Sequence, residues 1–160
     1  MFRLGHASGT DRLYAFVRIG HDGDADLDGD PRPPGAYIVA FDLNGTYQWD
    51  HELPFIENIA ATPAGVNAAG FFGGDFDFGG RPRNATRPTA YLASYGTDGS
   101  YRWDRLIAAE GRIRIRGLAR GESLLAATGS FVGDADFGDG YRCSSSGTTD
   151  ITENAFALIL

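Results

Sequence analysis

The sequence has no lysine, a single cysteine and no long apolar run, and each of these absences excludes something. All 14 basic residues are arginine, a bias that indicates a GC-rich genome and suggests a bacterial origin. Because Cys143 is alone, no intrachain disulfide can form, and a buried or inert thiol is its ordinary role. No segment approaches the roughly 18 apolar residues that a membrane-spanning helix needs, and residues 1–6 lack the apolar run of a signal peptide. We therefore expect a soluble chain that carries no targeting segment of its own.

Helix signals are also nearly absent. No window places apolar residues at i, i+3, i+4 and i+7 between capping residues. The chain has instead 42% hydrophobic and 12% aromatic residues, enough for a core in 160 residues, with 23 glycines and 7 prolines spread along it. This composition favours one domain, 1–160, made of short strands joined by tight turns.

The charge balance excludes two classes of partner. The chain carries 21 acidic and 14 basic residues, which gives a net charge of −7. Nucleic acid and anionic lipid surfaces repel such a chain unless it has a local basic patch. We therefore expect neither nucleic acid nor a membrane as a partner.

The sequence repeats itself. The segment 36–50 recurs as 90–104, shifted by 54 positions, and both copies end in Tyr-x-Trp-Asp. Inside the copies stand Asn44-Gly45 and Asp98-Gly99, which are strong hairpin signals because two-residue type I′ turns need a positive φ at both central residues.

Two further markers extend the repeat to three copies. Asp-x-Asp followed by Leu or Phe occurs at 24–27, 75–78 and 134–137. An extended segment, a glycine turn and another extended segment precede the second and third markers, while the first copy keeps only a stump near its start. These markers predict an all-β fold of three units, each made of about four short antiparallel strands: approximately 1–53, 54–107 and 108–160.

These motifs resemble a known family. The series Gly-x-Phe-x-Gly-x-x-Asp-Phe-Gly, an apolar strand and Asp-Gly-x-x-x-Trp is similar to the repeats of bacterial seven-bladed β-propeller repeat proteins. The likeness covers nearly the whole chain and is best at 72–80 and 129–138. The resemblance implies propeller blades and a place outside the cell or on its surface, but it is nearly silent on activity, because propellers host many functions.

The predicted ring is incomplete in one chain. The third copy stops at Leu160 without an Asp-Gly-x-x-x-Trp strand, and three blades cannot close a ring that typically needs four to eight. Either the chain is a fragment of a longer propeller, or identical chains complete one another. Two chains would make six blades, with the start of one chain and the end of the other sharing a composite blade.

The clearest candidate site is an acidic run in the first unit. It contains Asp-x-Asp-x-Asp-Gly, the opening of a calcium loop, whose alternate carboxylates can converge on one hard cation. The candidate calcium ligands are Asp24, Asp26, Asp28 and Asp30. The Glu that an EF-hand loop has at its twelfth position is missing, since Gly35 stands there, and the run also overlaps the repeat marker. A solvated acidic strand end is therefore the alternative, and a second group, Asp134, Asp136 and Asp139, is a weaker case of the same kind.

Two other patterns have a structural and a functional interpretation. Arg112, Arg114 and Arg116 alternate along a strand, so they can pair with neighbouring Asp, line a channel or bind an anion. Trp49 and Trp103 recur at equal spacing, as blade core does, whereas exposed aromatic residues would suit stacking on sugar rings.

No catalytic residues and no cofactor other than calcium are predicted. There is no Gly-x-Ser-x-Gly element, and His6, His21 and His51 share no metal-ligand spacing. We therefore expect a non-enzymatic propeller segment that acts as a scaffold or binding surface for an unknown protein or glycan. The alternatives are a lectin-like carbohydrate-binding propeller and the remnant of a quinoprotein-like propeller enzyme.

The calcium hypothesis makes a direct prediction. Titration of the chain with calcium should release heat in a saturable isotherm, and Asp26→Ala should abolish it, because each carboxylate contributes to the charge that holds the cation. Asp11→Ala, outside the run, serves as the control and should leave the isotherm unchanged. A flat titration of the unmodified chain would favour the solvated strand end.

Overall fold

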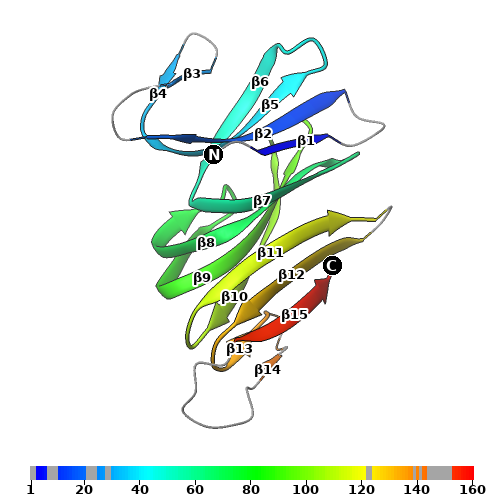
Figure 1. The fold of residues 1–160 in the computed structure, drawn as a ribbon. Helices are drawn as coiled ribbons and strands as arrows, with labels where there is room; N and C mark the ends of the chain where they lie inside the picture. Colours follow the sequence, from blue (N-terminus) through cyan, green and yellow to red (C-terminus); the bar gives the residue numbers. More distant parts are fainter. Residues whose placement is uncertain are drawn as a thin grey trace.

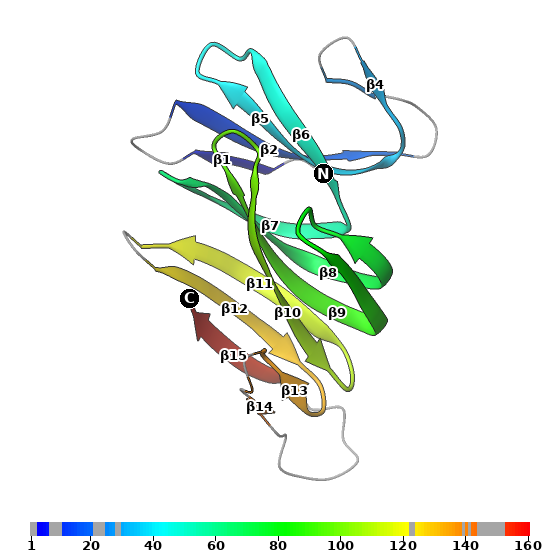
Figure 2. The same ribbon diagram turned by 180° about the vertical axis from the view of Figure 1, so that it is seen from behind.

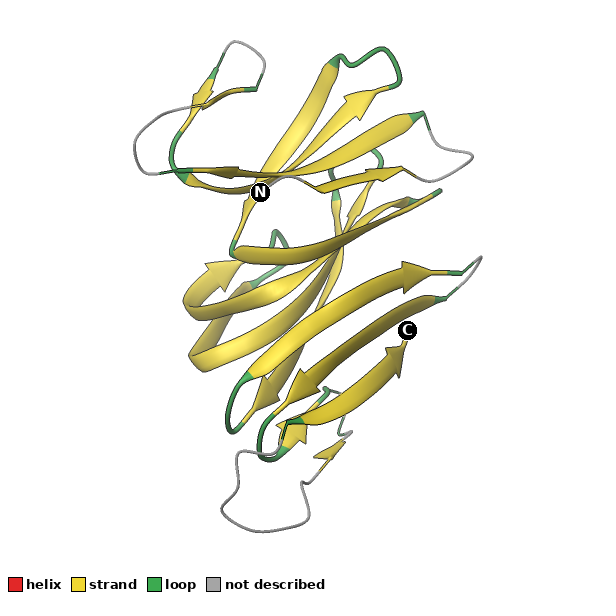
Figure 3. Cartoon of the chain, in the orientation of Figure 1, coloured by secondary structure: helices red, strands yellow, loops and turns green. Residues whose placement is uncertain are grey.

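Strands form nearly all of the regular structure in the described part of the chain. The structure is a computed structural model that describes residues 3–6, 11–20, 25–27, 30–121, 124–138, 140, 142–143 and 153–160. Within these ranges there are strands and connecting loops but no helix (Figure 3), so none of the described residues forms a helix able to cross a membrane.

The strands form three larger antiparallel sheets that follow one another along the molecule (Figure 1). The first sheet has the order β1-β2-β5-β6, which are Arg3–His6, Arg12–Ile19, Gly35–Asp42 and Tyr47–Leu53. The middle sheet contains β7, β8, β9 and β10, which are Phe55–Thr62, Gly65–Asp77, Pro82–Gly96 and Tyr101–Ala109. The last sheet has the order β11-β12-β15, which are Ile113–Arg120, Leu125–Phe131 and Asn154–Ile159. The prediction of an all-β antiparallel fold is confirmed, and the sheets do not close into a barrel.

Two short hairpins lie in the connections between strands. β3 (Ala25–Asp26) pairs with β4 (Pro31–Arg32) between β2 and β5 of the first sheet. β13 (Ala135–Asp136) and β14 (Arg142–Cys143) lie between β12 and β15 in sequence, but β13 pairs with β10 and so extends the middle sheet. Seen from behind in Figure 2, these two strands lie at the lower end of the molecule, near the end of β10.

The hairpins predicted at the two Asx-Gly pairs are present, but their loops are one residue longer than the two-residue type I′ prediction. In the first, Asp42 and Thr46 close the strand pair around three residues, and Gly45 has φ 83°. A type I turn followed by a left-handed glycine is the usual three-residue hairpin. The Asp42 carboxylate accepts the N–H groups of Thr46 and Asn44, which lowers the pKa of that carboxyl group and holds the turn.

A β-bulge recurs on the first strand of the middle and last sheets. It lies between Ile56 and Asn58 in β7, and β11 has the same irregularity. Opposite the first bulge, Gly70 lies so close to the neighbouring backbone that an added Cβ would stand 1.8 Å from the carbonyl oxygen of Phe55. Gly129 has the same relation to Arg114. Only glycine fits these two positions.

The middle sheet is packed on both faces. On β9, Tyr91, Ala93 and Tyr95 belong to a cluster shared with the first sheet, whereas the alternate residues Ala90 and Leu92 belong to a cluster shared with the last sheet. Both sets are almost fully buried. The period of two along the strand therefore divides the core of the molecule into two layers.

The close approach at the bulge gives a stability prediction. Gly70→Ala should lower the free energy of unfolding by about 3 kcal/mol, because the methyl group would meet a backbone oxygen that cannot move away. Gly73→Ala is the matched control in the same strand: its added Cβ meets nothing within 4 Å, so it should change stability by less than about 0.5 kcal/mol. Denaturant unfolding of both variants measures the difference, and equal midpoints would contradict the account of the bulge.

Candidate functional site

The Asp-x-Asp-Phe markers have a structural role in the two copies that are described. The carboxylate of Asp77 accepts the N–H of Gly79 at 2.8 Å, and that of Asp136 accepts the N–H of Gly138 at 2.9 Å. Both glycines have a positive φ, and the phenylalanine between each pair is buried. The aspartates therefore hold a turn that directs an aromatic ring into the core.

Only two of the four candidate calcium ligands, Asp26 and Asp30, lie in the described residues. Asp26 is exposed in β3, and Asp30 is exposed with its backbone carbonyl accepting from Arg32. Asp24 and Asp28 lie outside the described residues, as does Asp139 of the weaker group. In the ranges that are described, no three His, Cys, Asp or Glu side chains are grouped to hold a metal. Calcium binding at this run stays a prediction.

Tyr-x-Trp-Asp places a polar trio in both hairpins. Tyr47 donates to Asp50 at 2.8 Å, and Arg32 pairs with the same carboxylate at 2.8 Å. Burial, followed by the bond to Asp50, raises the pKa of the Tyr47 hydroxyl and keeps it a donor.

The second hairpin has the same trio. Tyr101 donates to Asp104 at 2.7 Å, and Arg83 pairs with that carboxylate at 2.7 Å. Arg32 comes from β4, which precedes β5, whereas Arg83 comes from the first residues of β9. The start of β9 therefore contributes one arginine to an ion pair with a fully buried carboxylate.

The alternating arginines pair with glutamates rather than with the expected aspartates. Arg114 pairs with Glu57 at 2.8 Å and lies over the ring of Phe71. Arg116 pairs with Glu153 at 3.2 Å in an exposed position. Structural pairing is therefore supported for these two residues.

Glu57 also ties the middle sheet to the last one. It is the residue that the β7 bulge leaves without a strand partner, and its second carboxylate oxygen accepts the N–H of Ile115 at 3.1 Å. Beside it, the buried Asn58 amide donates to the carbonyl of Ile115 at 2.9 Å. The bulge thus turns two side chains toward the backbone of β11.

The indole of Trp49 fills the contact between the first and middle sheets. It packs beside Tyr14 and Tyr95, with ring centroids 5.9 and 6.5 Å away. Its N–H donates to the carbonyl of Thr97 at 3.0 Å, and the next residue on the same face, His51, contacts the carbonyl of Gly99 at 2.6 Å. The first sheet therefore holds the β9–β10 hairpin of the middle sheet by its carbonyl oxygens.

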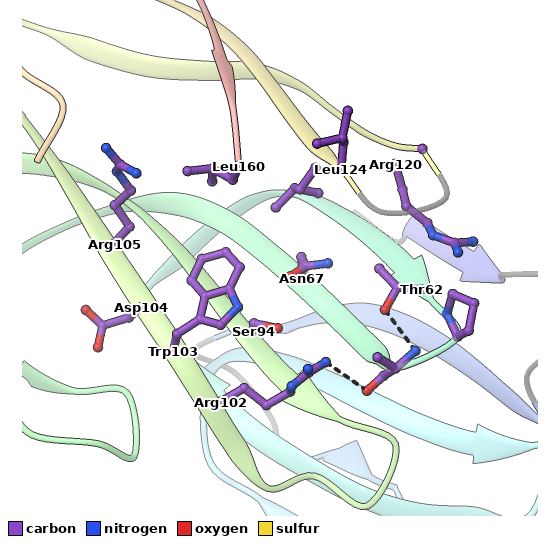
Figure 4. A pocket seen from close by; sticks show the side chains of 14 residues that line it. Thr62, Asn67, Ser94, Arg102, Trp103, Asp104, Arg105, Arg120, Leu124 and Leu160 are labelled. Atoms are coloured by element: carbon purple, nitrogen blue, oxygen red, sulfur yellow. Dashed lines mark hydrogen bonds between the residues drawn. The ribbon is translucent and has the colours of Figure 1, made fainter. Parts of the chain in front are cut away.

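Trp103, the counterpart of Trp49, packs against the second layer of the core and also lines a cavity of about 690 Å³. The cavity lies between the middle and last sheets (Figure 4), and Asn67, Ser94 and Arg102 line its wall on the middle sheet. On the opposite side it is lined by Leu124, Leu160 and neighbouring residues of the last sheet. Within the described residues, the Trp103 N–H and the side chains of Asn67 and Ser94 make no hydrogen bond.

Sequence reasoning missed this cavity, because Trp103 was assigned to the core together with Trp49. Cys143 was expected to be buried or inert and is exposed in β14, so the expectation of burial was wrong. The serine-rich segment 144–146 lies outside the described residues.

No protein-family model matches the sequence, and a search of the curated proteins finds no relative. The resemblance to seven-bladed β-propeller repeat proteins therefore stays a prediction that rests on the motifs themselves.

The polar trio gives a prediction about stability. Arg83→Ala should lower the free energy of unfolding by about 3 kcal/mol, because it leaves the fully buried carboxylate of Asp104 without its cation. Arg116→Ala breaks an exposed ion pair and should cost less than about 1 kcal/mol. Denaturant unfolding compares the two variants, and equal losses would argue against a structural role for the trio.

Proposed function

We propose that this chain is a segment of a β-propeller that serves as a non-catalytic scaffold and binding surface. The observation that carries the proposal is a shared strand register. Tyr14 pairs with Ala40 in the first sheet. In the middle sheet Asn67, which lies 53 positions after Tyr14, pairs with Ser94, which lies 54 positions after Ala40. The last sheet supports the same alignment, because its bulge also lies opposite a glycine that approaches the backbone closely.

The way in which the sheets stack also supports propeller blades. Ile38 of the first sheet packs toward the middle sheet, and its counterpart Leu92 packs toward the last sheet. The same face of each unit thus meets the next unit, and the first strands of the three sheets lie close together, β7 against both β1 and β11. One repeated sheet-on-sheet relation with the first strands adjacent is the arrangement of blades around an axis.

The use of the ionisable groups favours a scaffold over an enzyme. In the described residues, the best-buried carboxylates, Asp50 and Asp104, are held in the two trios, and Glu57 bridges two sheets. Groups committed in this way to arginine and backbone partners are poor candidates for proton transfer. The exposed surface of the chain is therefore the part that can recognise a partner.

The carbohydrate-binding alternative rests on Trp103. Its indole borders an open cavity beside the polar side chains of Asn67 and Ser94, a combination that suits a sugar ring and its hydroxyl groups. Titration with a panel of monosaccharides would support this alternative if the heat of binding is lost in Trp103→Ala.

The two ends of the stack differ in how far they are covered. The outer face of the first sheet is closed, since Ile19, Tyr37 and Val39 are buried in a cluster that includes Leu27. On the outer face of the last sheet, Ala157 is exposed and Ile159 is 67% exposed. Of the two ends, the last sheet therefore leaves more apolar surface uncovered in the described residues.

If a second copy completes the ring, the assembly should have twice the mass of one chain. Light scattering of the folded chain should give about 34 kDa, twice 17.1 kDa. Ala157→Arg should return the sample to the mass of one chain, because the long cation disrupts the open face, whereas Thr86→Arg at another exposed strand position should not. A monomeric mass for the unmodified, well-folded chain would exclude completion by identical chains.

A further inference from the structure

The cavity at Trp103 corresponds to a contact that is filled elsewhere in the same molecule. Trp49 and Trp103 occupy the same position in successive units, one at the contact of the first and middle sheets and one at the contact of the middle and last sheets. At the first contact, the β9–β10 hairpin covers the indole and accepts its N–H through Thr97. At the second contact, no hairpin of the described residues covers the indole, and the cavity lies beside it.

The side chains around the two indoles differ in size, and this difference leaves space for the cavity. Tyr14 beside Trp49 corresponds to Asn67 beside Trp103, and Tyr95 corresponds to Leu160. Both replacements are smaller, so they leave room over Trp103. Leu124, on the far wall of the cavity, is 54% exposed although it is a large apolar side chain (Figure 4).

A strand edge that no described strand pairs with borders the cavity. Leu125 and Leu160 exchange both of their backbone hydrogen bonds, at 2.9 Å each. In an antiparallel pair the residues alternate, so Ala155, Ala157 and Ile159 direct their N–H and C=O groups away from β12. β15 is the outermost strand of its sheet in the described residues, and such an edge is a template for another strand.

In the middle sheet the corresponding edge is occupied. Ala90, Leu92 and Ser94 are the counterparts of the three edge residues, and they pair with Ile107, Arg105 and Trp103 of β10. The contact between the first two sheets therefore shows which element fits the second contact: an Asx-Gly hairpin over the indole, followed by a strand along the edge.

We propose that the Trp103 cavity and the edge of β15 together form a docking site for a β-strand led by an Asx-Gly turn, of the same kind as residues 96–109 of this chain. The turn covers Trp103 and accepts its N–H through a carbonyl oxygen, and the strand pairs antiparallel with β15 in the register that β10 takes on β9. The proposal deepens the proposed function, since it names the partner that a blade surface of this kind binds, and it rests on the equivalence of the units argued there.

The test is binding of a synthetic peptide with the sequence of residues 96–109, its tryptophan replaced by phenylalanine. The chain carries Trp49→Phe, so that only Trp103 emits. Addition of the peptide should shift the emission of Trp103 to shorter wavelength in a saturable way, because the hairpin covers the indole. Calorimetry on the unmodified chain should give the same affinity, since the Trp49 contact is already filled.

One variant of the chain and one matched pair of peptide variants identify the contacts. Trp103→Phe in the chain removes the N–H and keeps an aromatic ring, so calorimetry should show an affinity lower by about two- to tenfold. In the peptide, proline at the Arg105 position removes an N–H that faces β15 and should weaken binding more than tenfold, whereas proline at the Leu106 position, whose N–H faces away, should weaken it less.

The outcomes that overturn the proposal are separate from those that test the scaffold. Absence of peptide binding to a chain with intact strand circular dichroism overturns the docking site, as does binding that Trp103→Phe and the peptide prolines leave unchanged. A sugar that binds at Trp103 while the peptide does not would assign the cavity to carbohydrate instead. The mass of the assembled chain is measured without peptide and tests the propeller by itself.

Discussion

The middle sheet buries apolar side chains on both of its faces, and the other two sheets are arranged to satisfy that requirement. β9 shows the constraint most simply, because Tyr91 packs toward the first sheet and its neighbour Leu92 packs toward the last, both with no exposed area. A sheet of this kind cannot stand alone in water, since one apolar face would always be exposed. The middle sheet therefore depends on both of its neighbours, and the two ends of the stack differ from its middle.

Polar residues set the spacing between the sheets once apolar packing brings them together. The β7 bulge directs Glu57 and Asn58 onto the backbone of Ile115, near the close approach of the first strands. At the other side of the sheets, Trp49 and His51 hold the carbonyls of the next hairpin. The two connections act at different contacts, one between the middle and last sheets and the other between the first and middle sheets, so each fixes the spacing of its own pair of sheets.

The sequence repeat was a good guide to the strands, because hairpin turns and alternating apolar positions are local signals. The hairpin glycines Gly45 and Gly99 lie at the turns where that reasoning placed them. The pairing of β13 with β10 could not be foreseen, since it joins residues of different units through tertiary packing. The partners of Arg114 and Arg116 were also beyond sequence reasoning, because Glu57 and Glu153 are distant along the chain.

The cavity at Trp103 shows where a repeat acquires a capacity to bind. Equal spacing assigned Trp49 and Trp103 the same role, and both do pack against the core. Their surroundings differ at positions that no motif marks, where Tyr14 becomes Asn67 and Ala40 becomes Ser94. These changes replace a buried ring and a methyl group with groups that can form hydrogen bonds. The proposed docking site therefore lies at the contact whose lining residues, Asn67 and Ser94, are smaller or more polar than their counterparts Tyr14 and Ala40.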